Sequence, residues 1–157
     1  MGARANALAD TAQKAYDDFA SGIQGLSDAQ WRGTTAAEGW AVAATARHAV
    51  AGLPFTLGLA QAIANGQPLP PITLEARDEN NAEHAKEHAN CSKEEVLGLA
   101  RQHAPVVVAA IRGMSDEQLD RSAYFAAMGA DLTTQQALER IVIGHAGSHL
   151  ESIKASS

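Results

Sequence analysis

The chain has 157 residues, of which 46% are hydrophobic but only 4% aromatic, and its formal net charge at pH 7 is -6. This length suits one domain with its own core, so we expect a single domain over residues 1–157. The acidic balance and the scattered basic residues argue against nucleic acid and against an anionic membrane surface as partners. No apolar run reaches the ~20 residues that span a bilayer. The first residues lack the apolar core of a signal peptide, and the single cysteine, Cys91, cannot form an internal disulfide, so we expect a cytoplasmic protein.

Residues 4–25 are expected to form the first helix, because apolar side chains recur there at helical spacing. This stripe consists of Leu8, Ala12, Ala15, Phe19, Ile23 and Leu26. Residues 27–30 form a Ser-x-x-Gln capping box that opens a short turn. The second helix is expected over residues 41–65, with His48 in line with its apolar positions. Pro54 removes one backbone hydrogen bond within that helix and predicts a kink at residues 50–54.

A proline-rich connector follows the second helix. Residues 67–73, Gln-Pro-Leu-Pro-Pro-Ile-Thr, cannot be helical and are expected to be extended. At a rise of ~3 Å per residue, about ten such residues cover ~30 Å, which is the length of a helix bundle. Residues 75–90 are expected to form a second, mostly polar helical region.

Two further helices are predicted in the second half of the chain. Residues 92–95, Ser-Lys-Glu-Glu, cap the third helix, which contains Pro105 as a second internal breaker. Residues 115–118 cap a short turn, and residues 133–136 cap the fourth helix. One face of that helix carries Leu138, Ile141, Val142, His145 and His149. No strand pattern competes, and residues 124–131 are expected to form a loop, so the sequence predicts an all-α four-helix bundle.

Three histidines form a candidate metal site. His145 and His149 are four residues apart, so both rings lie on one helix face about one turn apart and can bind the same ion. His48 on the second helix offers a third ligand, which would leave an open coordination position. Each ligating ring also needs an acceptor for its other nitrogen, and the sequence does not identify these acceptors. The structural alternatives are a histidine pair at the solvent boundary and a hydrogen-bonded core histidine.

The topology of the bundle decides whether these histidines meet. In an up-down-up-down bundle the second and fourth helices are parallel, and His48 would lie about 20 Å from His145 and His149. In an up-down-down-up bundle the two helices are antiparallel, and the three residues come level. That arrangement needs a long crossover between the second and third helices, which residues 67–73 can provide.

The order of these features resembles the DinB/YfiT-like superfamily over nearly the whole chain. The features are Gly39-Trp40 leading to His48, the proline-rich connector, Asn81-Ala82, the Ser92-capped helix and the final His-x-x-x-His. The resemblance implies a bundle of up-down-down-up topology, often dimeric, in which the three histidines bind a divalent metal, commonly zinc or nickel. It also implies possible use of a low-molecular-weight thiol such as mycothiol or bacillithiol. Ala41 departs from the Ser or Thr that often begins the second helix in the family.

On this basis we expect a metalloenzyme that acts on a small-molecule substrate, either as a thiol-dependent S-transferase or as a metal-dependent hydrolase. No general acid or base beside the histidines is evident, so a non-catalytic metal-binding or stress-response bundle is the alternative. We also expect a homodimer, both from the resemblance and because apolar or small side chains on the first helix lie off its main stripe and could form a second, shallow face for a partner helix. These are Ala5, Ala9, Tyr16 and Ala20, and helix propensity alone is the competing explanation.

The remaining histidines and the cysteine are expected to be structural. His84 and His88 form a second His-x-x-x-His pair, but their neighbours indicate a solvated helix face. His103 lies on an apolar stripe and is expected to bind a backbone carbonyl, with a role near the site as the alternative. Cys91 precedes a helix cap and is expected to be incidental. Trp31 and Trp40 are expected to pack at the end of the bundle.

Overall fold

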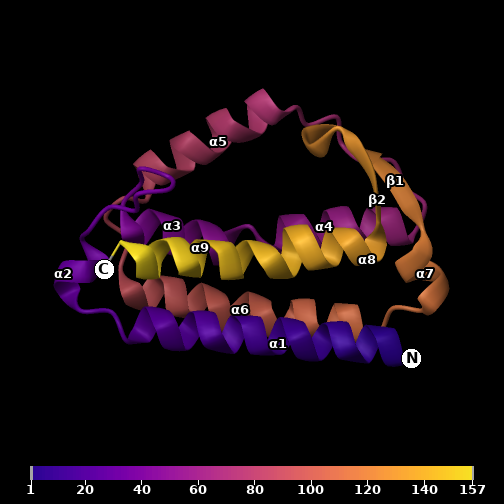
Figure 1. The fold of residues 1–157 in the computed structure, drawn as a ribbon, viewed down its shortest axis with the longest axis horizontal. Coiled ribbons are helices and arrows are strands. Elements are labelled where there is room, and N and C mark those ends of the chain that lie inside the picture. Colours follow the sequence, from indigo (N-terminus) through magenta and orange to yellow (C-terminus); the bar gives the residue numbers. More distant parts are fainter. Residues whose placement is uncertain (1, 157) are drawn as a thin grey trace.

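The computed structural model describes residues 2–156, which form a bundle of α-helices with one small β-hairpin (Figure 1). The main helices are α1 (Ala3–Gln24), α3 (Val42–Ala51), α4 (Leu53–Ala64), α6 (Lys93–Arg112) and α9 (Gly144–Ala155). The other helices are α2 (Asp28–Trp31), α5 (Leu74–Glu87), α7 (Asp116–Asp120) and α8 (Thr134–Ala137). A π-helical segment, η2 (Leu138–Ile143), joins α8 to α9. The expected all-α fold is confirmed.

The main helices run in two directions. Figure 1 shows α1 and α9 running one way along the bundle, and α3, α4 and α6 running the other. Contacts at one end agree with this view, because Cys91, just before α6, donates from Sγ to the carbonyl of Ala43 in α3 at 3.3 Å. Trp31 Nε1 donates to the carbonyl of Cys91 at 3.0 Å. The starts of α3 and α6 therefore lie together, and the chain returns along the bundle between α4 and α6.

This return is made by two segments of different kinds. Residues 67–73 lack regular structure, as their prolines predict, but they lead only to the start of α5. The helix α5 then runs back along the outside of the bundle, separate from the main layers (Figure 1). It matches the polar helical region expected over residues 75–90. The helix, rather than the extended connector, thus covers most of the crossing.

The core is built from small and aliphatic side chains. Ala5, Ala9 and Ala12 of α1 are fully buried, which allows α1 and α6 to approach closely. Tyr16 is 3% exposed, and its hydroxyl donates to the carbonyl of Val142 at 3.1 Å. The prediction that Ala5, Ala9, Tyr16 and Ala20 form a free second face was therefore wrong for the first three, which are buried, whereas Ala20 is half-buried. Their off-stripe positions are covered within the chain, because α1 packs against α6 on one side and against η2 and α9 on the other.

The two internal prolines act differently. The second helix is interrupted where the kink was expected, since Gly52 separates α3 from α4. Pro54 lies in the first turn of α4, where its missing N–H has no helical acceptor to lose. Pro105, expected as a breaker, lies inside α6, which continues to Arg112. Packing of α6 against α1 and α3 holds the helix together across that position.

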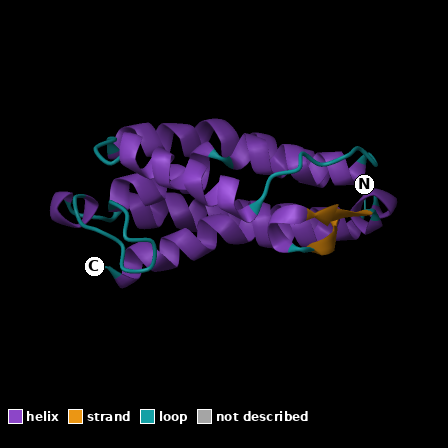
Figure 2. Cartoon of the chain, turned by 90° about the horizontal axis from the view of Figure 1, so that it is seen from above, coloured by secondary structure: helices purple, strands orange, loops and turns teal. Residues whose placement is uncertain are grey.

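The prediction of a loop over residues 124–131 was also wrong. The strands β1 (Ser122–Phe125) and β2 (Ala130–Thr133) pair antiparallel, from Ser122 opposite Thr133 to Phe125 opposite Ala130. The short 3-10 helix η1 (Ala126–Met128) and Gly129, at φ 62°, make the turn. Leu132 anchors the hairpin because its side chain is only 2% exposed. Figure 2 shows the hairpin at the end of the bundle that also holds the N-terminus.

The predicted helix starts are supported by their hydrogen bonds. Thr133 accepts from the backbone N–H of Gln136 at 3.1 Å, and the Gln136 side chain accepts from the backbone N–H of Thr133 at 3.0 Å. Ser27 and Ser115 form the same reciprocal boxes, and Ser92 caps α6 through the N–H of Glu95. Among the described residues, no helix combines the length and apolar character needed to cross a membrane.

Candidate metal centre

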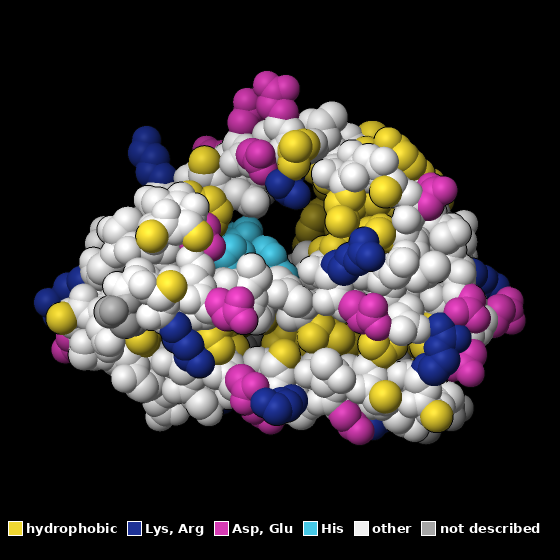
Figure 3. All heavy atoms as spheres, viewed as in Figure 1, with side chains coloured by type: hydrophobic (Ala, Val, Ile, Leu, Met, Phe, Trp, Pro, Cys, Tyr) yellow, Lys and Arg dark blue, Asp and Glu magenta, His cyan; other side chains and the backbone are white. Residues whose placement is uncertain are grey.

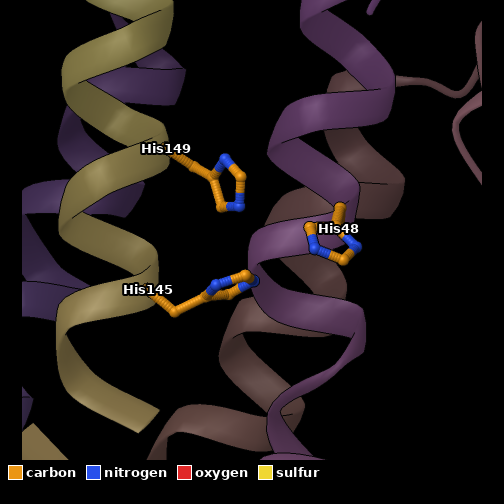
Figure 4. A group of neighbouring side chains, drawn as sticks. All are labelled: His48, His145 and His149. Atoms are coloured by element: carbon orange, nitrogen blue, oxygen red, sulfur yellow. The ribbon is translucent and has the colours of Figure 1, made fainter. Parts of the chain in front are cut away.

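His48, His145 and His149 meet between two antiparallel helices. Figure 4 shows His145 and His149 projecting from α9 toward His48 on α3. One nitrogen atom from each ring can be chosen so that all three lie within 4.8 Å of one another. The ring centroids are 4.9 Å apart for His48 and His145 and 4.4 Å apart for His145 and His149. In the part of the chain that the structure describes, this is the group of side chains arranged to share one metal ion.

A local widening of the last helix precedes the histidine pair. The π-helical segment η2 ends immediately before Gly144, and His145 is the next residue. A Cβ atom at position 144 would lie 2.7 Å from the carbonyl oxygen of Glu139, which is closer than real Cβ atoms approach. Glycine therefore allows the wide turn to close into α9. Such π turns occur frequently at functional sites, because the extra residue changes which side chains face a neighbour.

The protein environment keeps two of these rings neutral. Burial, together with the nearby charges of His145 and His149, lowers the pKa of His48 to about 3. Burial, with contributions from His149 and Arg77, lowers the pKa of His145 to about 4. At neutral pH both imidazoles therefore have a lone pair available, and neutral imidazole is the form that binds metal ions.

Glu38 supplies the acceptor that sequence reasoning did not identify. Its Oε1 accepts from His149 Nδ1 at 3.0 Å, and its Oε2 accepts from the hydroxyl of Ser152. Burial alone would raise the pKa of Glu38, but hydrogen bonds from Ser152, Thr35 and His149 outweigh it and the pKa is lowered. The carboxylate thus fixes the Nδ1–H tautomer of His149 and leaves Nε2 free for a metal ion.

The loop before α3 positions this carboxylate. Thr35 donates its N–H to the carbonyl of Trp40 at 2.8 Å, and Thr34 forms a bridge with Ala41, so the loop is closed at its base. Gly39 turns the chain with φ 71°, a conformation that favours glycine. A sequence signal existed, because Glu38 is the only acidic residue between Asp28 and Glu75.

The residues present fit a divalent transition metal. Three imidazoles from two rigid helices provide the donors, and one ring is oriented by a carboxylate, as is usual for ligating histidines. Imidazole suits both zinc and nickel, and three protein ligands are typical of a site that retains an open position. The donor set is therefore consistent with the metals that the resemblance implies.

The helix α5 brings a fourth histidine to this site. The ring of His84 lies 5.5 Å from that of His48, centroid to centroid, and Arg47 Nη1 lies 2.8 Å from His84 Nε2. The expectation of a wholly solvated face is therefore wrong for His84, because the crossing of α5 places it over α3. His88 lies further along and reaches Glu87 only at 3.9 Å. His103 Nδ1 lies 2.9 Å from the carbonyl oxygen of Val50, which confirms the expected bond to a backbone carbonyl.

The cysteine and the tryptophans have distinct surroundings. Burial, followed by the nearby charge of Glu95, raises the pKa of Cys91 to about 11, which fits an incidental thiol. Trp31 is 9% exposed and packs in the core near the start of α6, as expected. Trp40 differs, because its ring stands edge-on to His48 with centroids 5.5 Å apart. It therefore forms one wall of the site.

Comparisons with known proteins agree with this architecture. The model of the DinB superfamily matches residues 11–153. A crystal structure of a mutant of mycothiol-dependent maleylpyruvate isomerase superposes with a TM-score of 0.69 at 15% identity. The match covers 98% of this chain and 63% of that one, so this chain spans less than two thirds of that protein. This likeness shows the fold. A search of curated proteins found no match.

Proposed function

This chain belongs to the DinB superfamily, and on that premise we propose that it is an enzyme dependent on a divalent metal ion, zinc or nickel. His48, His145 and His149 would hold the ion, and the substrate would be a small molecule. One observation carries the proposal: three imidazoles, two of them with strongly lowered pKa values, converge from α3 and α9 with nitrogen atoms within 4.8 Å. When bound, a divalent ion would lower the pKa of a water or a thiol and so supply a nucleophile at neutral pH.

The protein's own residues have separate tasks in this proposal. Glu38 orients His149 through Oε1, and Ser152 holds the carboxylate through Oε2. Trp40 stands edge-on to His48 and would limit the access of water on that side. Because both oxygens of Glu38 are already engaged, this carboxylate is not free to take a proton from a substrate.

That engagement favours a thiol-dependent transfer over hydrolysis. A thiol has an unperturbed pKa near 8.5, so an adjacent ion suffices to ionise it, whereas hydrolysis also benefits from a free general base. The similar solved structure is that of an enzyme described as mycothiol-dependent, which supports the same choice here. The second candidate is a metal-binding bundle without catalysis. The engagement of Glu38 is compatible with it as well, because it leaves this carboxylate unable to act as a general base.

Metal content tests the site directly. Protein purified without a histidine tag should contain about one equivalent of zinc or nickel by elemental analysis, as expected for one three-histidine site. His145→Ala should lose most of it, because one of three ligands is gone. His88→Ala is the matched control and should keep the metal, since this ring pairs loosely with Glu87 and stands outside the donor set. Full retention of metal in His145→Ala would contradict the proposal.

A spectroscopic titration separates thiol use from the alternatives. The cobalt-substituted protein should develop a sulfur-to-metal charge-transfer band with 2-mercaptoethanol, and none with ethylene glycol. Turnover with a panel of thiols and electrophiles would then identify the reaction. Absence of the band at saturating thiol would argue for hydrolysis or for a non-catalytic role.

A further inference from the structure

The face of α5 that overlies the site is polar, which is unusual for a helix packed on a bundle. Within α5, Ala85 is the buried residue, while Asn81 and His84 are half-buried. Arg77, Asn81 and His84 are spaced by four and then three residues, so they lie on one side of the helix. A helix that served only to cover a core would place apolar residues there. This side of α5 therefore calls for an explanation other than packing.

Between α5 and the three histidines, hydrogen-bond donors outnumber free acceptors. Arginine can only donate, so its 2.8 Å contact makes His84 Nε2 an acceptor and leaves the proton on Nδ1. That Nδ1–H is buried and has no hydrogen-bond partner among residues 2–156. Two nearby carboxylates are already used, because Glu95 pairs with Arg47 at 2.7 Å and Glu38 binds His149 and Ser152, while Glu87 lies 3.9 Å from His88. A ligand that fills this space should thus bring acceptors.

Arg77 adds a positive charge to the side of α5 that carries His84, because the two residues lie seven positions, or about two turns, apart. Its guanidinium pairs with the adjacent Asp78, through Nε and Nη2 at 3.1 and 2.9 Å, and both side chains are substantially exposed. An exposed pair of this kind is weak, so it gives way easily to a competing anion. The cation is therefore available to a ligand even though the whole chain is acidic.

The space under α5 is open to solvent and has an apolar side. Figure 3 shows an opening between α5 and the bundle, with histidine side chains along one wall and hydrophobic side chains gathered over the hairpin on the other. Leu74 at the start of α5, Tyr124 in β1 and Met128 in η1 are large hydrophobic residues that remain 43% to 62% exposed. Tyr124 and Met128 belong to the hairpin, and the turn of that hairpin, η1, packs against α5. A ligand in the opening would meet basic groups near the histidines and apolar groups opposite them.

We infer that the site takes a small carboxylate with an apolar body, and that Arg77 binds its carboxylate from α5. This inference rests on the proposed function, since it specifies the substrate class of the same site. Arg77 is a binding residue here, and Asp78 is its competitor. The apolar body lies toward the hairpin, while the carboxylate satisfies the excess of donors beneath α5.

A matched pair of probes tests the charge requirement. Phenylacetate and its neutral analogue phenylacetamide are titrated into the full chain by calorimetry at low ionic strength, with and without zinc. Arg77→Gln should weaken phenylacetate binding roughly tenfold and leave phenylacetamide unchanged, because a charge-assisted contact is lost. Asp78→Asn should strengthen phenylacetate binding severalfold, since it frees Arg77 and removes a negative charge. Arg101→Gln is the control, because it removes the same charge from an exposed position on α6.

The arms of the experiment separate this inference from the metal proposal. In the metal-free protein the preference for phenylacetate should persist and should still depend on Arg77. Failure of the wild-type chain to bind either zinc or nickel would overturn the proposed function but would leave that metal-free comparison as the test of Arg77. Equal phenylacetate affinity for wild type and Arg77→Gln, with normal zinc content in both, would overturn this inference alone. A normal thermal unfolding transition in each variant shows that the fold is intact.

Discussion

Glu38 connects the loop before α3 to the last helix. It binds His149 at 3.0 Å and holds Ser152 one turn further along α9. A partner of this kind fixes the tautomer and the direction of a ligating ring, and its loss typically costs 10–100-fold in metal affinity. We therefore expect Glu38→Gln to weaken zinc binding roughly 10–100-fold, as measured by competition with a chromogenic chelator. Glu83→Gln, on the exposed side of α5, is the control, and equal affinity of the two variants would contradict the assignment.

Cys91 allows a second prediction at the scale of one residue. Its pKa of about 11 means that ~0.1% of the thiol is ionised at pH 8, and the thiolate is the reactive form. Alkylation by iodoacetamide should be much slower in the folded protein than in urea at pH 8, and the folded rate should rise steeply up to pH 11. The same rate in both states, followed by mass spectrometry, would show that the thiol is not shielded.

At the scale of the element, the junction between η2 and α9 determines where the histidines point. Gly144 leaves no room for a Cβ atom, whereas a Cβ atom added at Gly147 in the same helix would meet nothing within 4 Å. Gly144→Ala should therefore cost about 1–3 kcal/mol of unfolding free energy and lower metal affinity, because His145 is the next residue. Gly147→Ala should instead add about 0.4–1 kcal/mol, since it removes backbone freedom from the unfolded chain.

Urea unfolding of the metal-free variants measures both glycine effects, and the chelator competition measures the affinity. If Gly144→Ala matched Gly147→Ala in both measurements, the wide turn would have no role in placing His145. The comparison keeps the helix, the substitution and the change in side-chain size constant, so the difference reports the local geometry.

At the scale of the whole molecule, self-association remains a prediction that rests on the family alone. Three of the four residues on the face of α1 that suggested a dimer are buried within the chain, so a second copy would have to use mainly another surface. A stable pair should bury well over ~1,000 Å² in total. Light scattering at micromolar concentration should give a mass near twice 16.4 kDa, and a monomer mass with and without zinc would contradict the prediction.

The sequence alone determined the helical class and most helix starts, and it identified the three histidines as candidate metal ligands. These features depend on short-range physics: a Ser or Thr that binds an N–H three residues later, an apolar side chain every three or four residues, and two rings one turn apart. The cap formed by Thr133 is one example, and the spacing of His145 and His149 is another. In both, residues close in the chain determine the local geometry. The break at Gly52 was predictable for the same reason, because Pro54 cannot donate a helical hydrogen bond.

Only the tertiary structure showed what lies opposite these residues. Glu38 and His149 are separated by 111 positions, and Arg47 and His84 by 37, so no local pattern relates them. The continuity of α6 through Pro105 and the burial of Ala5 and Ala9 likewise depend on helices distant in sequence. Local hydrogen bonding and periodicity fix an element and its faces. Which residues meet across those faces follows from how the elements pack, and here that packing placed the carboxylate of Glu38 behind His149 and the polar helix α5 beside His48.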